Sequence, residues 1–173
     1  KIKITLYGSF KETYKGHGTD IALIGGLLGY NTSDKRIRTS LEDAKEAGID
    51  FEFIESEVEH IHPNTAKLEV EAGRHSLDLI GKSIGGGKMV IFELLGFDVN
   101  LSGDFPSYFV FYKFSEKNKI HLLSEINNIF GDNKVSDNFS DSILEGVNLL
   151  VVEVLEEIST KQIERIANLE YVN

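Results

Sequence analysis

Cysteine and tryptophan are absent from this sequence, which also has only two prolines and one methionine among its 173 residues. Without cysteine the chain can form no disulfide and can offer no thiolate to a metal ion. A site on this protein that uses metal–sulfur chemistry must therefore receive its thiolates from a partner chain.

Positive charge is also scarce, and long hydrophobic runs are lacking. Lys and Arg number 18 against 28 Asp and Glu, which gives a formal net charge of −10 at pH 7. Nucleic-acid affinity depends mainly on cations that neutralise phosphates, so this balance argues against nucleic-acid binding. No apolar run is long enough to span a bilayer, and no positively charged segment precedes an apolar stretch, so we expect a cytoplasmic protein.

The length and hydrophobic content are those of a folded globular protein. Hydrophobic residues make up 41% of the sequence. At 173 residues, the chain is long enough to bury a core either as one large domain or as two small ones. Lys1 is not a methionine and already lies in a strand-like run. We therefore expect that some N-terminal sequence precedes it.

Residues 1–103 combine helical and strand patterns, which predicts an α+β fold with a mixed α/β sheet. Ile2, Ile4 and Leu6 alternate with polar residues, the period of a half-buried strand. Further strands are expected from the same period around 51–53, 66–70, 77–79, 89–91 and 97–101. Helix starts are expected where a glycine or a capping side chain precedes an apolar stretch: Gly8, Thr19 or Asp20, and Ser33 or Asp34.

The Gly-Asp-Phe-Pro run at 103–106 is the expected boundary to a second domain, 107–173, because Gly and Pro interrupt regular structure. Beyond it the pattern predicts strand, helix, strand, strand, helix and strand, with Thr160 capping the second helix. The expected ranges are 108–114, 120–130, 134–143, 148–155, 160–166 and 170–172. This βαββαβ order is that of a ferredoxin-like domain.

Three short motifs in the first domain combine exposed backbone with hydrogen-bonding side chains, as the walls of one small polar pocket would. They are Gly16-His17-Gly18-Thr19-Asp20, His62-Pro63-Asn64-Thr65 and Ser83-Ile84-Gly85-Gly86-Gly87. The flanking glycines let the main chain approach a ligand closely, and the imidazole of His17 can move a proton near neutral pH. A purely structural alternative is a loop histidine that caps the following helix.

The other two motifs have functional and structural interpretations as well. Backbone N–H groups from Ser83 to Gly87 could form a concavity for a carboxylate, although glycines between two strands often serve only a tight turn. His62 and Asn64 can donate to a carboxylate, and Pro63 stiffens the turn between them. The Gly-Lys-Ser run at 81–83 lacks the earlier glycine of a phosphate-binding loop, which excludes that motif.

Four runs in one order give the sequence a family resemblance: Leu6 to Phe10, Tyr14 to Asp20, His62 to Thr65 and Ser83 to Gly87. Together they closely resemble the beta chain of the iron–sulfur-dependent L-serine dehydratases, over most of residues 1–103. The βαββαβ pattern of 107–173 is similar to that family's ACT-type domain. The resemblance implies a lyase that converts L-serine to pyruvate and ammonia, with a [4Fe–4S] cluster held by cysteines of a separate alpha chain.

The resemblance also implies roles for the motif residues. His17 would be the catalytic base, with Thr19 and Asp20 fixing its ring. Serine recognition would involve a larger set: Gly16, Gly18, Thr19, Asp20, His62, Asn64, Thr65, Ser83, Gly85, Gly86 and Gly87. The ACT-like domain would serve regulation or assembly, including association between copies of the chain.

Other interpretations remain open. The family's Ser-Ser-Ser-His segment precedes the first strand and is not in this sequence, so the chain is expected to be inactive alone. The 116–119 loop lacks the glycine that amino-acid-binding ACT domains usually have. The first domain also resembles the allosteric substrate-binding domains of some phosphoglycerate dehydrogenases, so the alternative function is a non-catalytic amino-acid sensor. A metal pair at His60 and His62 lacks a third ligand, and Glu52, Glu55, Glu57 and Glu59 are expected to form a solvated face.

Overall fold

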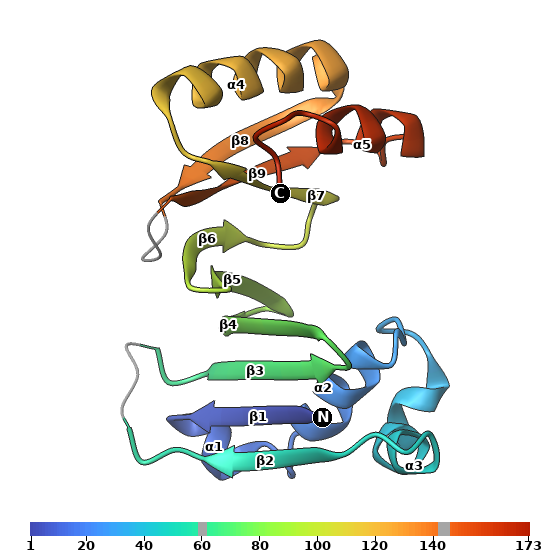
Figure 1. The fold of residues 1–173 in the computed structure, drawn as a ribbon. Helices are drawn as coiled ribbons and strands as arrows, with labels where there is room; N and C mark the ends of the chain where they lie inside the picture. The colour runs from blue at the N-terminus through green and yellow to red at the C-terminus, as the bar shows by residue number, and fades with distance from the viewer. Residues whose placement is uncertain (59–61, 142–145) are drawn as a thin grey trace. The chain divides into compact units, whose positions relative to one another are not determined.

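The computed structural model describes residues 1–58, 62–141 and 146–173 and has an α+β architecture (Figure 1). It divides into two compact units, Lys1–Met89 and Val90–Asn173. In the described ranges no helix is both long and apolar enough to cross a membrane.

The first unit is built on strands in the order β2-β1-β3-β4. Strand β1 pairs in parallel with β2 and antiparallel with β3, and β3 is antiparallel to β4. These strands and the helices between them have the following bounds: β1 Ile2–Tyr7, α1 Ser9–Thr13, α2 Thr19–Leu27, η1 Lys35–Thr39, α3 Ser40–Glu46, β2 Phe51–Glu55, β3 Thr65–Ala72 and β4 His75–Gly85. The expected first strand and the strand at 51–53 are therefore confirmed.

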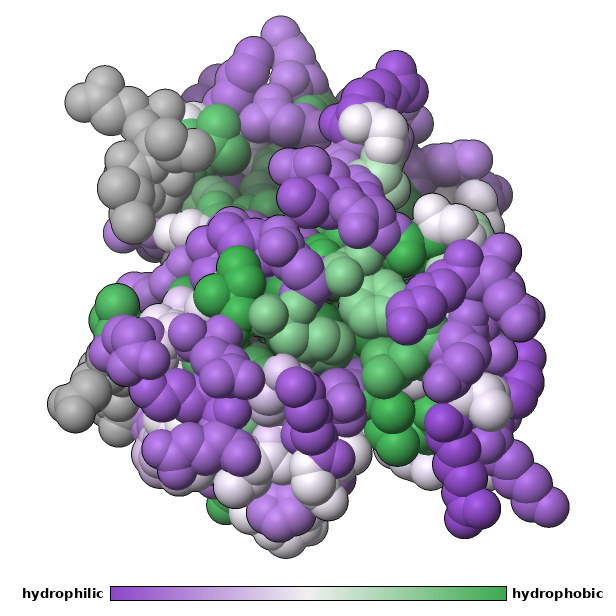
Figure 2. Space-filling model, turned by 90° about the horizontal axis from the view of Figure 1, so that it is seen from below, coloured by the Kyte–Doolittle hydropathy of each residue, from purple (hydrophilic) through white to green (hydrophobic). Residues whose placement is uncertain are grey.

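Alternation along β1 places one face of this sheet against the helices. Ile4 and Leu6 are fully buried and share a core with Ile24 of α2 and Ala44 of α3. Lys3 and the other intervening residues lie on the opposite face, where Lys3 pairs with Glu69 at 3.4 Å. Strand β2 forms the edge of the sheet, and Figure 2, which looks from that side, shows hydrophobic surface surrounded by hydrophilic residues.

The helix starts in this unit differ in detail from those expected. Gly18, not Thr19 or Asp20, is the residue before α2, and it has a left-handed backbone. The Asp34 side chain accepts a hydrogen bond from the Arg36 N–H, as expected of a cap, but it opens a short 3-10 helix. Helix α3 then begins separately at Ser40, whose buried hydroxyl donates to the Ile21 carbonyl oxygen at 2.7 Å.

The second unit contains a three-stranded sheet in the order β7-β9-β8, with antiparallel neighbours. It also holds most of the β5–β6 hairpin, which precedes the sheet in the chain. The element bounds are β5 Lys88–Leu94, β6 Phe97–Leu101, β7 Ser107–Lys113, α4 Glu116–Phe130, η2 Gly131–Asn133, β8 Lys134–Ser140, β9 Val147–Val154 and α5 Thr160–Ala167.

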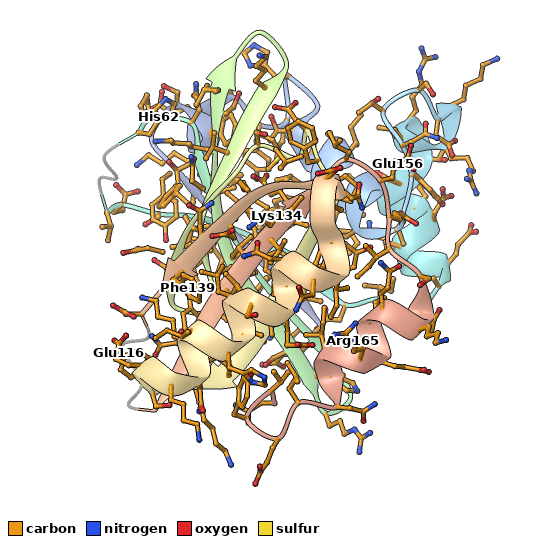
Figure 3. All side chains as sticks on the ribbon, turned by 90° about the horizontal axis from the view of Figure 1, so that it is seen from above. His62, Glu116, Lys134, Phe139, Glu156 and Arg165 are labelled. Atoms are coloured by element: carbon orange, nitrogen blue, oxygen red, sulfur yellow. The ribbon has the colours of Figure 1, made fainter. Side chains whose placement is uncertain are left out.

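The central strand β9 is apolar on both faces because both faces are covered. Leu150 and Val152 pack against Leu122 and Ile126 of α4 in one core. On the other face, Leu149 and Val151 pack against Phe97 and Leu101 of β6 in a second core. Figure 3 shows α4 and α5 crossing one face of the sheet, with Glu116, Phe139 and Arg165 labelled.

The expected last strand at 170–172 is reduced to a single bridge between Tyr112 and Val172. Residues 168–171 form a turn, in which the Val172 N–H donates to the Leu169 carbonyl oxygen, so only the last residues of the chain run beside β7. The helix before it is also capped one residue earlier than expected. Ser159, not Thr160, is the N-cap of α5, in a reciprocal capping box with Gln162.

The division of the chain at Met89 lies earlier than the boundary expected at 103–106. Strand β6 belongs to the second unit because Phe97 and Leu101 pack on β9. Whether 103–107 is a joint between independently folding parts stays a prediction.

Candidate functional site

The His62–Thr65 motif forms a closed turn at the start of β3, and His62 is labelled in Figure 3. The Thr65 hydroxyl is fully buried and donates to the His62 carbonyl oxygen at 2.7 Å. The Asn64 N–H donates to His62 Nδ1 at 3.2 Å. Because Nδ1 accepts this bond, the neutral imidazole of His62 carries its proton on Nε2 and can donate it to a ligand.

Two other segments are bonded directly to this turn. The Phe10 N–H, at the start of α1, donates to the Pro63 carbonyl oxygen at 3.3 Å. The Ser83 N–H, near the end of β4, donates to the Asn64 carbonyl oxygen at 2.9 Å. The structure therefore brings together two of the three motifs and the start of α1.

Ser83 and the glycines after it do not form a continuous row of free donors. The Ser83 N–H is already used by Asn64, so it is not available to a carboxylate. Gly86 and Gly87 are exposed and have φ values of 62° and 74° in the two-residue connection between β4 and β5. Two positive φ values in such a connection are the pattern of a type I′ turn, which is the tight-turn alternative. Gly85, with φ 85°, ends β4 beside it.

The Gly16–Asp20 motif follows a residue anchored in the core; Gly16 and His17 are exposed, and the rest of the motif is half-buried. Tyr14 is buried and its ring stacks on Phe53 with centroids 5.4 Å apart. The Thr19 N–H then donates to the Tyr14 carbonyl oxygen at 2.8 Å, and the His17 N–H donates to the Thr13 carbonyl oxygen at 3.0 Å. These bonds hold the backbone of the loop while the His17 side chain lies exposed.

The side chains expected to fix the His17 ring have other positions. The Asp20 carboxylate accepts a hydrogen bond from the Ile21 N–H at 2.9 Å at the start of α2. Within the ranges that the structure describes, no hydrogen bond joins His17 to Thr19 or Asp20, and none joins this motif to the His62 turn. Gly16 is exposed, and Gly18 has φ 69°, which turns the chain into the helix.

Tyr7, Gly8 and Lys82 lie beside the turn but were given no role in the site from the sequence alone. Tyr7 and Lys82 are paired with Thr65 of the predicted motif in one row across β1, β3 and β4, and Gly8 follows Tyr7 at the corner into α1. The pairing of β1 with β3 places them there. Such long-range pairing leaves no local signal in the sequence.

The same sheet face carries a charged network one row further along. Lys67 pairs with Asp78 at 3.1 Å and with Glu69 at 3.4 Å. Burial opposes the charge on Lys67, but the hydrogen bond to Asp78 and the two carboxylates together raise its pKa. Burial likewise opposes the charge on Glu69, yet Lys67 and Lys3 lower the pKa of that carboxyl. Each of these lysines is paired with a carboxylate, which indicates that the network has a structural role.

Metal binding finds no support in the part of the chain that the structure describes. No group of three or more His, Asp or Glu side chains could hold an ion there. His60, the other member of the metal pair that lacks a third ligand, lies outside the described residues, as does Glu59. Glu52 and Glu57 are exposed and form ion pairs with Lys1 and Lys11 at 3.4 Å each, as expected of a solvated face.

A hollow of about 890 Å³ lies in the second unit, between α4 and the C-terminal segment. His121 Nδ1 and the Tyr171 hydroxyl are 2.7 Å apart on its wall. Burial, followed by the charge of Glu125, raises the pKa of Tyr171. None of the site residues expected from the sequence lines this hollow.

Comparison with known proteins identifies the family. Residues 1–93 match the model of the serine dehydratase beta chain family. The probable L-serine dehydratase beta chain of Bacillus subtilis (strain 168) is 51% identical over 110 residues, which are 64% of this chain and 50% of that protein. The L-serine dehydratase beta chain of Peptoniphilus asaccharolyticus is 39% identical over 114 residues, 65% of this chain and 51% of that protein.

The chain spans about half the length of these curated relatives. The family match covers 1–93 and so includes all three motifs and the whole of β1 to β4. This chain therefore belongs to the serine dehydratase beta chain family.

Proposed function

We propose that this chain is the beta subunit of an L-serine dehydratase, which acts with an alpha chain to convert L-serine to pyruvate and ammonia. The observation that carries the proposal is the exposed His17, held on a backbone-anchored loop between two glycines within the family-matching region. Membership of the family and the names of the two relatives support the substrate and the division into subunits.

His17 is the base in this proposal. Its imidazole takes the Cα proton of serine, and the β-hydroxyl leaves as water after it gains a proton. The resulting enamine tautomerises to an imine, and water hydrolyses the imine to pyruvate and ammonia. A general base of this kind must have a pKa near the working pH, which is the ordinary range of histidine.

The leaving hydroxyl needs an electrophile that this chain does not supply. The sequence has no cysteine, and the described residues include no cluster of metal-ligating side chains, so the chain does not fit an iron–sulfur cluster. We assign the [4Fe–4S] cluster to cysteines of the alpha chain, where it would act as Lewis acid on the serine hydroxyl. No residue of this chain is given a role in holding it.

Serine recognition is assigned to the His62 turn and the segments bonded to it. The Nε2–H of His62 and the side-chain amide of Asn64 can donate to the serine carboxylate. Thr65 holds the turn closed from its buried position, and Ser83 fixes it from β4. Gly85 to Gly87 leave the neighbouring turn without side chains that would block a ligand.

The C-terminal part, 107–173, is proposed as an ACT-like domain for regulation or assembly. The order β7-α4-β8-β9-α5 and the bridge to Val172 support this proposal. Association between copies of the chain is proposed through the same domain.

Co-purification with the alpha chain under anaerobic conditions tests the function. We expect a complex that contains iron and forms pyruvate from L-serine. The alternative, a non-catalytic amino-acid sensor, draws on the observation that the His62 turn and Ser83 are bonded to each other but, among the described residues, not to His17. Serine binding by the chain alone, unchanged by His17→Ala, together with no pyruvate from any complex, would favour the sensor.

A further inference from the structure

The corner between β1 and α1 places Gly8 directly against the turn that carries His62. Gly8 has φ 53° and ψ −131°, close to the mirror image of an extended conformation, which residues with a Cβ rarely adopt. An ideal Cβ on Gly8 would lie 2.6 Å from the carbonyl oxygen of Pro63 and 2.7 Å from its Cα. Both are backbone atoms, so no side-chain rotation could relieve the overlap.

The residues on both sides of Pro63 are held by further bonds. Thr65 is paired with Tyr7 in the β1–β3 ladder, and its hydroxyl is bonded to the His62 carbonyl oxygen. The Asn64 carbonyl oxygen accepts from the Ser83 N–H. A side chain at Gly8 would therefore displace Pro63 and strain the bonds made by its two neighbours.

We propose that Gly8 is a positioning residue for serine recognition. Its lack of a side chain lets the Pro63 peptide lie on the β1–α1 corner, where the Phe10 N–H holds it. The backbone of the turn is thereby placed, and with it the polar atoms of His62 and Asn64. The identity of the ligand rests on the proposed function, whereas the placement of the turn does not.

Gly131 offers a matched control. It follows α4 and has φ 51° and ψ −130°, almost the same backbone conformation as Gly8. Among the described residues, no heavy atom lies within 4 Å of a Cβ added there. Gly131→Ala thus introduces backbone strain of the same kind without the overlap, at a residue outside the motifs and the turn.

The test compares Gly8→Ala and Gly131→Ala in the assembled alpha–beta complex by hydrogen exchange and steady-state kinetics. In Gly8→Ala, amides in 9–13 and 81–85 should exchange faster, because the Phe10 and Ser83 bonds to the turn are disturbed. The apparent KM for L-serine should rise on the order of 10- to 100-fold, with a smaller change in kcat. Gly131→Ala should leave exchange in both segments and the KM as in the wild type.

The proposal is overturned if Gly8→Ala leaves both segments as protected as in the wild type, or if the two variants raise the KM equally. If the wild-type complex makes no pyruvate from serine, the proposed function fails, and hydrogen exchange alone tests the placement of the turn.

If Gly8→Ala does not fold, the double variant Gly8→Ala/Pro63→Gly tests the proposal instead. It should regain a cooperative melt, because the turn can then move away, and it should keep faster exchange in 81–85. A double variant as unfolded as the single one would overturn the proposal.

Discussion

His17 is the side chain on which the proposed chemistry depends, and its surroundings make a selective test possible. It is exposed, and its ring has no hydrogen-bond partner within the described ranges, so removing it should not disturb the fold. We expect His17→Ala to lower kcat for pyruvate formation by about 10²- to 10⁴-fold in the alpha–beta complex. His17→Asn should not restore activity, because an amide cannot accept the proton at neutral pH.

The control for this substitution is His75→Ala, since His75 is also exposed but lies at the start of β4 outside the motifs. Both variants should keep the iron content and melting temperature of the wild-type complex, and only His17→Ala should lose turnover. Near-normal turnover in His17→Ala would remove this residue as the base.

The glycine turn after β4 allows an equally selective comparison. Gly86→Val should raise the apparent KM for serine in the complex if the turn lies near the bound carboxylate. Gly73, in the turn between β3 and β4, has the same φ of 62° and, like Gly86, has no atom of the described residues within 4 Å of an added Cβ. Gly73→Val therefore also places a branched side chain at a positive φ in a hairpin turn. Equal KM values for the two variants would indicate that Gly86 serves only the turn and does not lie near the substrate.

Helix α5 provides a prediction about stability. The Ser159 side chain accepts from the Gln162 N–H, and the Gln162 side chain accepts from the Ser159 N–H. Ser159→Ala should lower the free energy of unfolding by about 1 kcal/mol, as measured by urea denaturation. Thr160→Ala, which removes the neighbouring hydroxyl, should change it by less than about 0.5 kcal/mol. The opposite ranking would contradict the assigned cap.

The contrast between Ser159 and Thr160 shows how closely the bounds of helices and strands could be predicted from the sequence. Period-two alternation at Ile2, Ile4 and Leu6 was sufficient to predict β1, because burial of one sheet face leaves that pattern in the chain. Helix ends depend on one hydrogen bond, so the exact cap was missed by one residue. The expected strand at 170–172 became a bridge because residues 168–171 form a turn and leave only Val172 to pair with Tyr112.

The candidate site was predictable as motifs but not as an arrangement. The His62 turn and Ser83 are bonded to each other, as neighbouring motifs would be, but in the described ranges no hydrogen bond joins them to the exposed His17. Whether the three motifs line one pocket stays a prediction. The contact of Gly8 with Pro63 depends on β1–β3 pairing across more than fifty residues, which no local pattern records. The use of the Ser83 N–H by Asn64 follows from the register of the β3–β4 hairpin.

For the whole chain, the segment after β6 gives a prediction about domain organisation. Residues 103–105 are exposed and lie outside regular structure, so limited proteolysis should cut between Gly103 and Ser107. The fragments should stay together in native gel filtration, because β6 on one side of the cut packs on β9 on the other. A segment that resists cleavage while the chain is cut elsewhere would count against an independent C-terminal domain.

The most direct test of the central proposal is a titration of the purified alpha chain with this chain under anaerobic conditions, followed by pyruvate formation from L-serine. We expect the alpha chain alone to be inactive and the rate to rise with added chain until it saturates at a fixed ratio. The His17→Ala variant should bind the alpha chain at the same ratio as the wild type but give almost no pyruvate at saturation. Full turnover by the alpha chain alone, unchanged when this chain is added, would contradict the claim that this subunit contributes to the active site.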